Sequence, residues 1–198
     1  MIRHLFFDAD GVLQRVPDGW HAAAEPLLGR YADEFLEEVW REERTALLGN
    51  DTMLAVITRV LDSLGLEADP LELLVGLWHQ VEVDAEVVAL IRELRASGFR
   101  TYLATNQNPE RLEYLRDGLG YRDLFDGFAC SCELGVIKPQ PEFFTRARRL
   151  AEAELGEVLL IDDSRINVAA AQEEGWSAIC WNNREPLARL RAEFAGLS

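Results

Sequence analysis

The sequence predicts an α/β fold of the doubly wound (Rossmann-like) type, with a small all-helical subdomain inserted near the N-terminus. Short apolar runs that end in polar clusters alternate with amphipathic helical patterns, which is the order of parallel βαβ units. The apolar runs do not alternate with polar residues, as expected of strands covered on both faces. One long segment after the first run contains helical patterns only.

The apolar runs predict four strands, at residues 2–7, 100–105, 158–161 and 177–181. Helical periodicity fills the segments between and after them, at 85–97, 109–119, 141–152 and 166–174. A polar helix is expected over 185–198. Glycine closely follows each internal helix, where a left-handed residue favours its end: Gly98, Gly120, Gly156 and Gly175.

Residues 16–81 contain helical patterns at 18–28, 31–48, 52–64 and 70–80, and no strand candidate. The turn at Gly49 and Asn50 separates two of them, and Asp51 or Thr52 is a suitable N-cap for the third. We therefore expect residues 16–81 to form a helical subdomain, and residues 1–15 and 82–198 to form the α/β core.

Composition limits the possible partners. The chain has 198 residues and a formal net charge of −15, from 35 acidic and 20 basic side chains. Such a surface repels nucleic acid and anionic membranes, so neither is expected as a partner, and the oligomeric state is left open. No run approaches the roughly 20 apolar residues that span a bilayer, and Asp8 interrupts the first apolar run too early for a secretory leader. Three cysteines without a CxxC pattern favour a cytoplasmic location.

Polar side chains follow three of the predicted strands, and one lysine lies in a loop between the second and third of them. Ligands of open α/β sheets bind beyond the carboxyl ends of the strands, so these side chains are expected to converge. They are Asp8, Asp10, Thr105, Asn106, Lys138, Asp162 and Asp163.

Carboxylates that lie close together repel one another and raise each other's pKa unless a cation lies between them. Mg²⁺, which prefers carboxylates, water and phosphate oxygens, is the expected cofactor, and a bound phosphoryl group is the expected ligand. A calcium loop starting at Asp8 is disfavoured, because Val12 and Leu13 stand where an oxygen ligand and a glycine are needed. Taken alone, Asp8-x-Asp10 could form a plain turn, Asp163-Ser164 could cap the following helix, and Lys138 could be a surface charge. Their order along the ends of the predicted strands instead favours a single site.

These motifs resemble those of the haloacid dehalogenase-like (HAD) hydrolase superfamily over the whole core. An apolar strand leads into Asp8-x-Asp10-Gly11, and a second strand ends in Thr105-Asn106. The run from Ser131 to Pro141 resembles the lysine motif, and Leu160-Ile161-Asp162-Asp163-Ser164 resembles the acidic pair. The helical insertion occupies the place of the family's first type of cap.

The resemblance implies a magnesium-dependent phosphohydrolase that acts on a small phosphorylated metabolite through an aspartyl-phosphate. Asp8 is implied as the nucleophile and Asp10 as the acid and base, while Thr105, Lys138 and the Asn106 amide hold phosphate oxygens. Asp8, the Asp10 carbonyl and Asp163 are implied as metal ligands. Asp162 is implied to orient them, and which of the last two acidic residues binds the metal directly is left open.

Three other readings remain. A phosphotransferase or mutase shares the first half-reaction, and a non-catalytic relative would normally lose one of the motif residues, all of which are present. Dehalogenation is disfavoured because that branch typically lacks the second aspartate of the first motif and needs no metal. The candidates for lining the substrate pocket are Trp20, His21, Trp40, Arg41 and Arg44.

Overall fold

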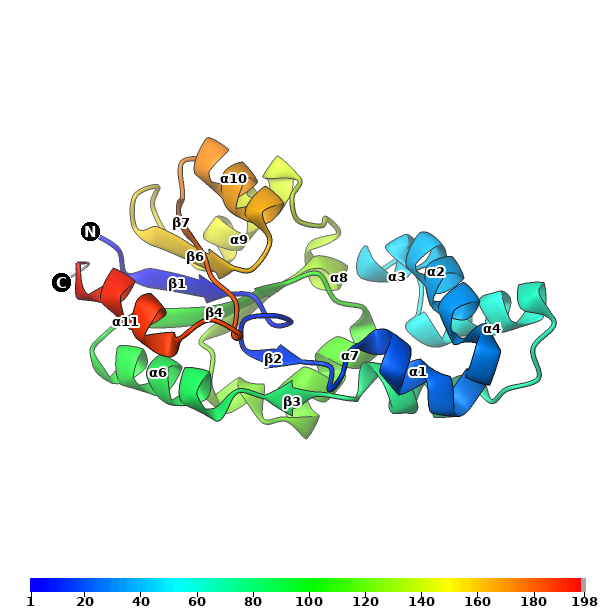
Figure 1. The fold of residues 1–198 in the computed structure, drawn as a ribbon. Coiled ribbons are helices and arrows are strands. Elements are labelled where there is room, and N and C mark those ends of the chain that lie inside the picture. The colour runs from blue at the N-terminus through cyan, green and yellow to red at the C-terminus, as the bar shows by residue number, and fades with distance from the viewer. Residues whose placement is uncertain (197–198) are drawn as a thin grey trace.

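The computed structural model describes residues 1–196 and contains a five-stranded sheet flanked by helices, with a helical subdomain at one end (Figure 1). All neighbouring strands are parallel, and their order is β5-β4-β1-β6-β7. This arrangement confirms the predicted α/β class. The strands are β1 (His4–Phe7), β4 (Arg100–Thr105), β5 (Gly127–Cys130), β6 (Val158–Asp162) and β7 (Ser177–Cys180).

The register of the three central strands aligns their carboxyl ends. Phe7 of β1 pairs with Leu103 of β4 on one side and with Ile161 of β6 on the other. Asp8, one residue beyond Phe7, therefore lies in the same row as Asp162, and the Asp8 amide donates to the Ile161 carbonyl at 2.9 Å. Because the strands are parallel, side chains from distant parts of the sequence meet at this edge.

Each face of the sheet is covered by its own set of helices (Figure 1). Helices α6 (Ala85–Ala96) and α11 (Leu187–Ala195) pack on the face that carries Leu5 and Phe7. Helices α9 (Pro141–Leu150) and α10 (Arg165–Glu173) pack on the face that carries Phe6. The alternation of side chains along β1 thus fills two hydrophobic clusters, which explains why every residue of this strand is buried.

Three local expectations were wrong. Strand β5 was not predicted, because it has four residues, begins with a glycine and lacks β-branched side chains. The helical pattern at 31–48 is interrupted at Glu43, between α2 (Ala32–Glu42) and α3 (Arg44–Leu47). The C-terminal helix is not merely polar, since Leu190 and Phe194 are buried in the core; residues 197 and 198 of the predicted helix lie outside the described part of the chain.

The segment between the first strand and α6 folds into helices around a third hydrophobic cluster, which includes Phe35 and Ile57. The chain reaches and leaves it through a short antiparallel ribbon of β2 (Gln14–Arg15) and β3 (Glu82–Val83), in which Arg15 donates twice to Glu82. We call residues 20–78 the helical subdomain. Besides α2 and α3 it contains α1 (Trp20–Leu28), η1 (Gly29–Tyr31), α4 (Met53–Leu64), α5 (Pro70–Leu73) and the π-helical turn η2 (Leu74–Trp78).

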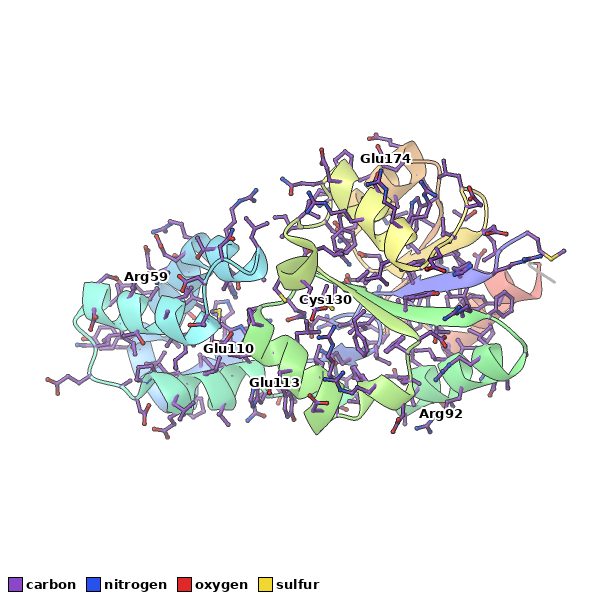
Figure 2. The ribbon with its side chains drawn as sticks, turned by 180° about the vertical axis from the view of Figure 1, so that it is seen from behind. Arg59, Arg92, Glu110, Glu113, Cys130 and Glu174 are labelled. Atoms are coloured by element: carbon purple, nitrogen blue, oxygen red, sulfur yellow. The ribbon has the colours of Figure 1, made fainter. Side chains whose placement is uncertain are left out.

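The helical subdomain docks on the core at two elements, α7 (Pro109–Glu113) and α8 (Ser131–Leu134). The carboxylate of Glu110 on α7 accepts hydrogen bonds from the Met53 and Leu54 amides, both at 3.1 Å, and so caps α4 (Figure 2). Gly49 lies so close to α8 that a Cβ atom there would be 2.0 Å from the Cys132 carbonyl oxygen. The remaining core elements are the π-helical turn η3 (Tyr114–Gly118) and η4 (Tyr121–Asp123).

Replacing Glu110 by alanine is expected to loosen this docking. The variant loses the acceptor of two first-turn amides, a change worth about 1 kcal/mol, so hydrogen exchange at the Met53 and Leu54 amides should accelerate roughly five- to tenfold. Exchange measured by NMR tests this. Glu113→Ala is the matched control, because it removes the same charge from an exposed side chain on the same helix. Equal acceleration in both variants would contradict the prediction.

Candidate active site

The predicted site residues from three strands meet at the carboxyl edge of the sheet. Asp8 follows β1, Thr105 ends β4 and Asp162 ends β6. Carboxylate oxygens of Asp8, Asp162 and Asp163 all lie within 4.8 Å of one another, and no other group of three or more His, Cys, Asp or Glu side chains in the described chain is arranged to hold a metal. Three carboxylates in so small a space require positive charge.

Lys138 supplies one positive charge at this edge. Its Nζ lies 3.1 Å from Asp8 Oδ1 and 2.6 Å from Asp162 Oδ2, and it also donates to the Ala104 carbonyl at 2.8 Å. The side chain is almost fully buried, and it is the single lysine of the sequence. Burial alone would lower the pKa of this ammonium, but attraction to Asp8 and Asp162 outweighs it and raises the pKa above its ordinary value.

One ammonium does not balance the acidic cluster. Burial, followed by repulsion from Asp162, Asp10 and Asp163, raises the pKa of Asp8 to about 8 against the opposing effect of Lys138. A carboxyl group with this pKa is mostly protonated at neutral pH and is then a poor nucleophile. The hard oxygen donors of the cluster fit a divalent cation such as Mg²⁺, which would restore the ionised form.

The two acidic residues at the end of β6 differ in what their oxygens contact. Asp162 is fully buried and accepts hydrogen bonds from Lys138, from the Ser164 amide and from Asn167 Nδ2. The Asp163 carboxylate is exposed, lines the cavity and has no hydrogen-bond or ion-pair partner among residues 1–196. This difference favours Asp163 as the direct metal ligand.

Gly11 is required beside Asp163. Its φ of +84° is in the left-handed region, and a Cβ at this position would lie 2.3 Å from Asp163 Oδ2. A larger residue would displace the carboxylate that faces the cavity. Gly11, which follows Asp10 directly in the sequence, therefore leaves room for the Asp163 carboxylate.

The side chain of Asp10 faces different neighbours from that of Asp8. Its Oδ1 accepts from Gln14 Nε2 at 3.0 Å and from Arg111 Nη2 at 2.6 Å, and its Oδ2 accepts from Gln107 Nε2 at 2.7 Å. Tyr121 in turn donates to Gln14 at 2.8 Å. None of these partners was expected from the sequence, although Gln107 directly follows the second motif and Arg111 lies one helical turn beyond it.

Thr105 and Asn106 have separate surroundings. Thr105 is buried, and its hydroxyl accepts from Gln107 Nε2 at 3.3 Å. The Asn106 side chain donates to the Lys138 carbonyl at 2.9 Å and accepts from the Lys138 amide at 2.8 Å. Asn106 thus fixes the backbone that carries the lysine, a contact that the sequence motif alone did not predict.

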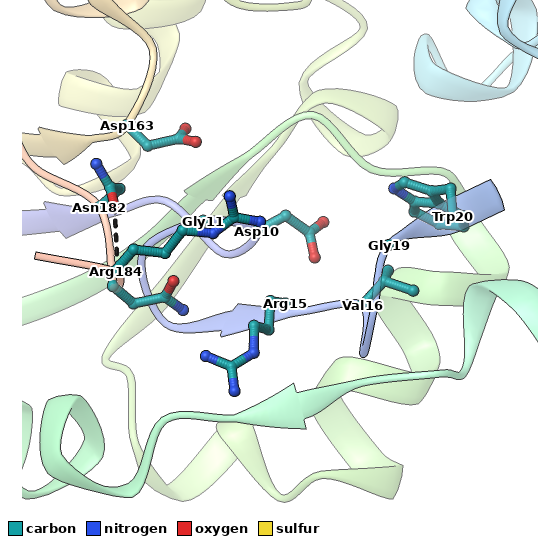
Figure 3. A pocket seen from close by; sticks show the side chains of 10 residues that line it. Asp10, Gly11, Arg15, Val16, Gly19, Trp20, Asp163, Asn182 and Arg184 are labelled. Carbon is teal, nitrogen blue, oxygen red and sulfur yellow. Dashed lines mark hydrogen bonds between the residues drawn. The ribbon is translucent and has the colours of Figure 1, made fainter. Parts of the chain in front are cut away.

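A cavity of about 490 Å³ opens beside the two motif aspartates, Asp10 and Asp163 (Figure 3). Of the five residues expected to line a substrate pocket, only Trp20 does so. His21 instead contacts Asp33, and Arg41 pairs with Glu38 on the helical subdomain's own surface. The lining residues are Asp10, Gly11, Arg15, Val16, Gly19, Trp20, Asp163, Asn182, Asn183 and Arg184.

Further groups lie at the junction between the helical subdomain and the core. The guanidinium of Arg111 lies 5.0 Å from the centre of the Trp20 ring. His79 stacks on Tyr114 with ring centroids 4.1 Å apart. Burial raises the pKa of Glu43 to about 7, although the positive charge of Arg111 opposes this shift.

The cysteines form no metal site in the described residues. All three are free; Cys130 is buried and Cys132 is half-buried. Burial raises the pKa of both thiols, so they remain protonated at neutral pH. Among residues 1–196, no helix combines the length and apolar character needed to cross a membrane.

The sequence profile of the haloacid dehalogenase-like hydrolase family matches residues 2–175 of the chain. The chain is 30% identical to the phosphoglycolate phosphatase of Cereibacter sphaeroides over 182 residues, which cover 85% of this chain and 80% of the relative. It is 26% identical to the (S)-2-haloacid dehalogenase of Xanthobacter autotrophicus over 204 residues, covering 96% and 79%. A match to the sesquiterpene phosphatase astK of Aspergillus oryzae, at 35% identity, spans 46% of this chain and 47% of that protein, about half of each.

Solved structures share the fold. A HAD family enzyme from Bacteroides thetaiotaomicron, in complex with magnesium and inorganic phosphate, superposes with a TM-score of 0.80 at 22% identity and covers 96% of this chain and 99% of its own. The L-2-haloacid dehalogenase of Xanthobacter autotrophicus superposes with a TM-score of 0.71 at 21% identity, covering 100% and 84%. At 22% and 21% identity, these two similarities show that the fold is shared.

The charge on Lys138 is expected to persist in alkaline solution. Because the sequence has one lysine, ¹³C-lysine labelling gives a single side-chain signal, whose Cε shift reports the protonation state. In metal-free protein this signal should remain that of an ammonium at a pH where free lysine is half deprotonated, and Asp162→Asn should lower the pKa. Titration of the wild type at or below the ordinary lysine pKa would contradict the geometry.

Glu43 is expected to destabilise the folded chain above neutral pH. Its folded pKa, about 7, exceeds the ordinary value of 4.5, so the folded state binds the proton more tightly and loses stability as pH rises between these values. Glu43→Gln should therefore increase the free energy of unfolding at pH 8 by roughly 2 kcal/mol and leave it nearly unchanged at pH 4.5. Urea unfolding at both pH values tests this, with Glu42→Gln, an exposed neighbour, as control. A pH-independent difference would refute the assignment.

Proposed function

Because the chain belongs to the haloacid dehalogenase-like hydrolase family, we propose that it is a Mg²⁺-dependent phosphatase that acts on a small phosphorylated metabolite through an aspartyl-phosphate on Asp8. The observation that carries the proposal is the pairing of Asp8 with Lys138, while the Asp163 carboxylate lines the adjoining cavity without a partner among the described residues. A nucleophile, a cation for phosphate oxygens and an open metal ligand then lie together.

Mg²⁺ would be held by Asp8, the Asp10 carbonyl and Asp163. When bound, it would neutralise the carboxylates and withdraw charge from the phosphoryl oxygens. The donor set supports this choice, since all the side chains in the cluster are carboxylates. The buried Asp162 would contribute by orienting Lys138 and Asn167 rather than by taking a coordination position.

The reaction divides between the two aspartates of the first motif. An Asp8 oxygen attacks phosphorus, the bond to the leaving oxygen breaks, and Asp10 donates a proton to that oxygen. Asp10 then takes a proton from water, whose oxygen attacks phosphorus and breaks the bond to Asp8, releasing inorganic phosphate. Thr105, Lys138 and the Asn106 amide hold phosphate oxygens during both steps.

Similarity to phosphatases supports the proposal, and similarity to a dehalogenase marks the competing chemistry. In that chemistry a carboxylate attacks carbon and expels halide. The presence of Asp10, and of the Asp163 carboxylate at the cavity, favours phosphoryl transfer. The three free cysteines and the net charge of −15 support a cytoplasmic enzyme whose partners are small molecules rather than nucleic acid or membranes.

Phosphate release from a panel of phosphorylated metabolites, with Mg²⁺ or with EDTA, tests the proposal. The wild type should release phosphate only with Mg²⁺, and Asp8→Asn should reduce the rate at least about 10³-fold, because the nucleophile is lost. Asp62→Asn, which alters an exposed side chain of α4, is the matched control and should retain full activity.

The products separate the remaining alternatives. An isomeric phosphate ester instead of inorganic phosphate would indicate a mutase, and halide release from 2-haloacids would indicate a dehalogenase. Phosphate release that survives Asp8→Asn, or that does not depend on Mg²⁺, would contradict the mechanism.

A further inference from the structure

Arg111 is a buried cation with unused hydrogen-bond donors. The side chain, on α7, is 1% exposed, and its Nη2 donates to Asp10 at 2.6 Å. Its Nε and Nη1 are also buried and have no hydrogen-bond partner among the described residues. Buried donors without partners are rare in folded proteins and typically mark a position that a ligand or water completes.

The groups around Arg111 do not supply the missing acceptor. Trp20 covers the guanidinium from the helical subdomain. Glu43 is near enough for the charge of Arg111 to affect its pKa, which burial raises to about 7, but the two side chains form no ion pair in the described chain. His79 Nε2 is buried without a partner in the described chain; burial and the charge of Arg111 lower its pKa, which keeps the imidazole neutral.

The position of Arg111 places it near the leaving portion of the substrate, beyond the oxygen that Asp10 would protonate. Asp8 would attack phosphorus and Asp10 would protonate the leaving oxygen, and Arg111 lies next to Asp10 on the side of the helical subdomain. Atoms two or three bonds beyond the leaving oxygen therefore come nearest to Arg111. A charge in this dehydrated place interacts strongly with an ion of opposite sign.

We propose that Arg111 binds an anionic oxygen group on the leaving portion of the substrate, a carboxylate or a second phosphate, and so selects phosphate esters of acidic alcohols. The inference rests on the proposed phosphatase function. Since the guanidinium is almost fully buried, the ligand reaches it when Trp20 moves. Trp20 belongs to the helical subdomain, which is joined to the sheet through the narrow ribbon of β2 and β3 and has a hydrophobic cluster of its own.

Two other arginines line the cavity itself, whereas Arg111 is covered by Trp20 and does not line it. Arg15 is paired with Glu82. Arg184 lines the cavity and its side chain extends toward Asp10 in Figure 3, but it is exposed, so solvent and salt screen its charge. Arg184 is therefore the alternative binding residue for an anionic group, and the experiment has to distinguish it from Arg111.

Four esters built on the same two-carbon unit test the proposal. Two are anionic beyond the ester, 2-phosphoglycolate and the larger ethylene glycol bisphosphate; 2-hydroxyethyl phosphate is neutral there, and phosphoethanolamine is cationic. The wild type with Mg²⁺ should show kcat/KM at least about tenfold higher for one or both anionic esters than for the neutral one. In Arg111→Gln this ratio should fall to about one, and Arg111→Lys should give an intermediate ratio. The ratio is measured within each variant, so a general loss of activity from disturbing Asp10 does not affect it.

Arg122→Gln is the control for net charge, because Arg122 pairs with Asp117 on the surface away from the cavity; it should keep the wild-type ratio. Equal rates for neutral and anionic esters in the wild type would overturn the inference and leave the phosphatase function standing. If Arg184→Gln loses the preference for anionic esters while the Arg111 variants keep it, the inference about Arg111 is overturned and Arg184 is the residue that binds the anionic group. Absence of hydrolysis of all four esters and of the wider panel would refute the phosphatase function, and the inference with it.

Discussion

A single ammonium, buried between Asp8 and Asp162, holds the strand ends of this protein together. Carboxylates removed from water are costly to fold unless they are paired, and each of these two lies within about hydrogen-bonding distance of Lys138 Nζ. The lysine in turn depends on Asn106, which binds both its amide and its carbonyl and therefore joins the end of β4 to the loop before α9. The register of the strands, the position of the loop that carries Lys138 and the charge balance of the site therefore depend on the same few contacts.

Asp8 and Asp10, which are separated by one residue, differ in their chemistry because their surroundings differ. Asp8 is buried among other carboxylates beside an ammonium, whereas Asp10 is half-buried and held by an arginine and two glutamines. Environments that differ in this way are how a site assigns separate roles to like groups. Gly11 contributes to the environment of Asp8, because its lack of a side chain lets the Asp163 carboxylate approach the turn.

The features predictable from sequence were those encoded locally. Apolar runs that end in acidic or hydroxyl residues identified β1, β4 and β6 and the residues that follow them, and the strand-end rule then predicted their convergence. Strand β5 was missed because its formation depends on pairing with β4 rather than on its own composition. The partners of Asp10 were missed for a similar reason: Gln14 and Arg111 are ordinary polar residues in the sequence, and only the tertiary fold brings them to one carboxylate.

Helix α7 carries two neighbouring residues with different attachments. Glu110 binds the first turn of α4, and Arg111 binds Asp10 while its other face contacts Trp20. The helical subdomain and the reactive carboxylate therefore share one short rigid element. Thermodynamic linkage is reciprocal: if the position of the subdomain changes the affinity of the site for a ligand by some factor, then the occupied site changes the equilibrium of the subdomain by the same factor.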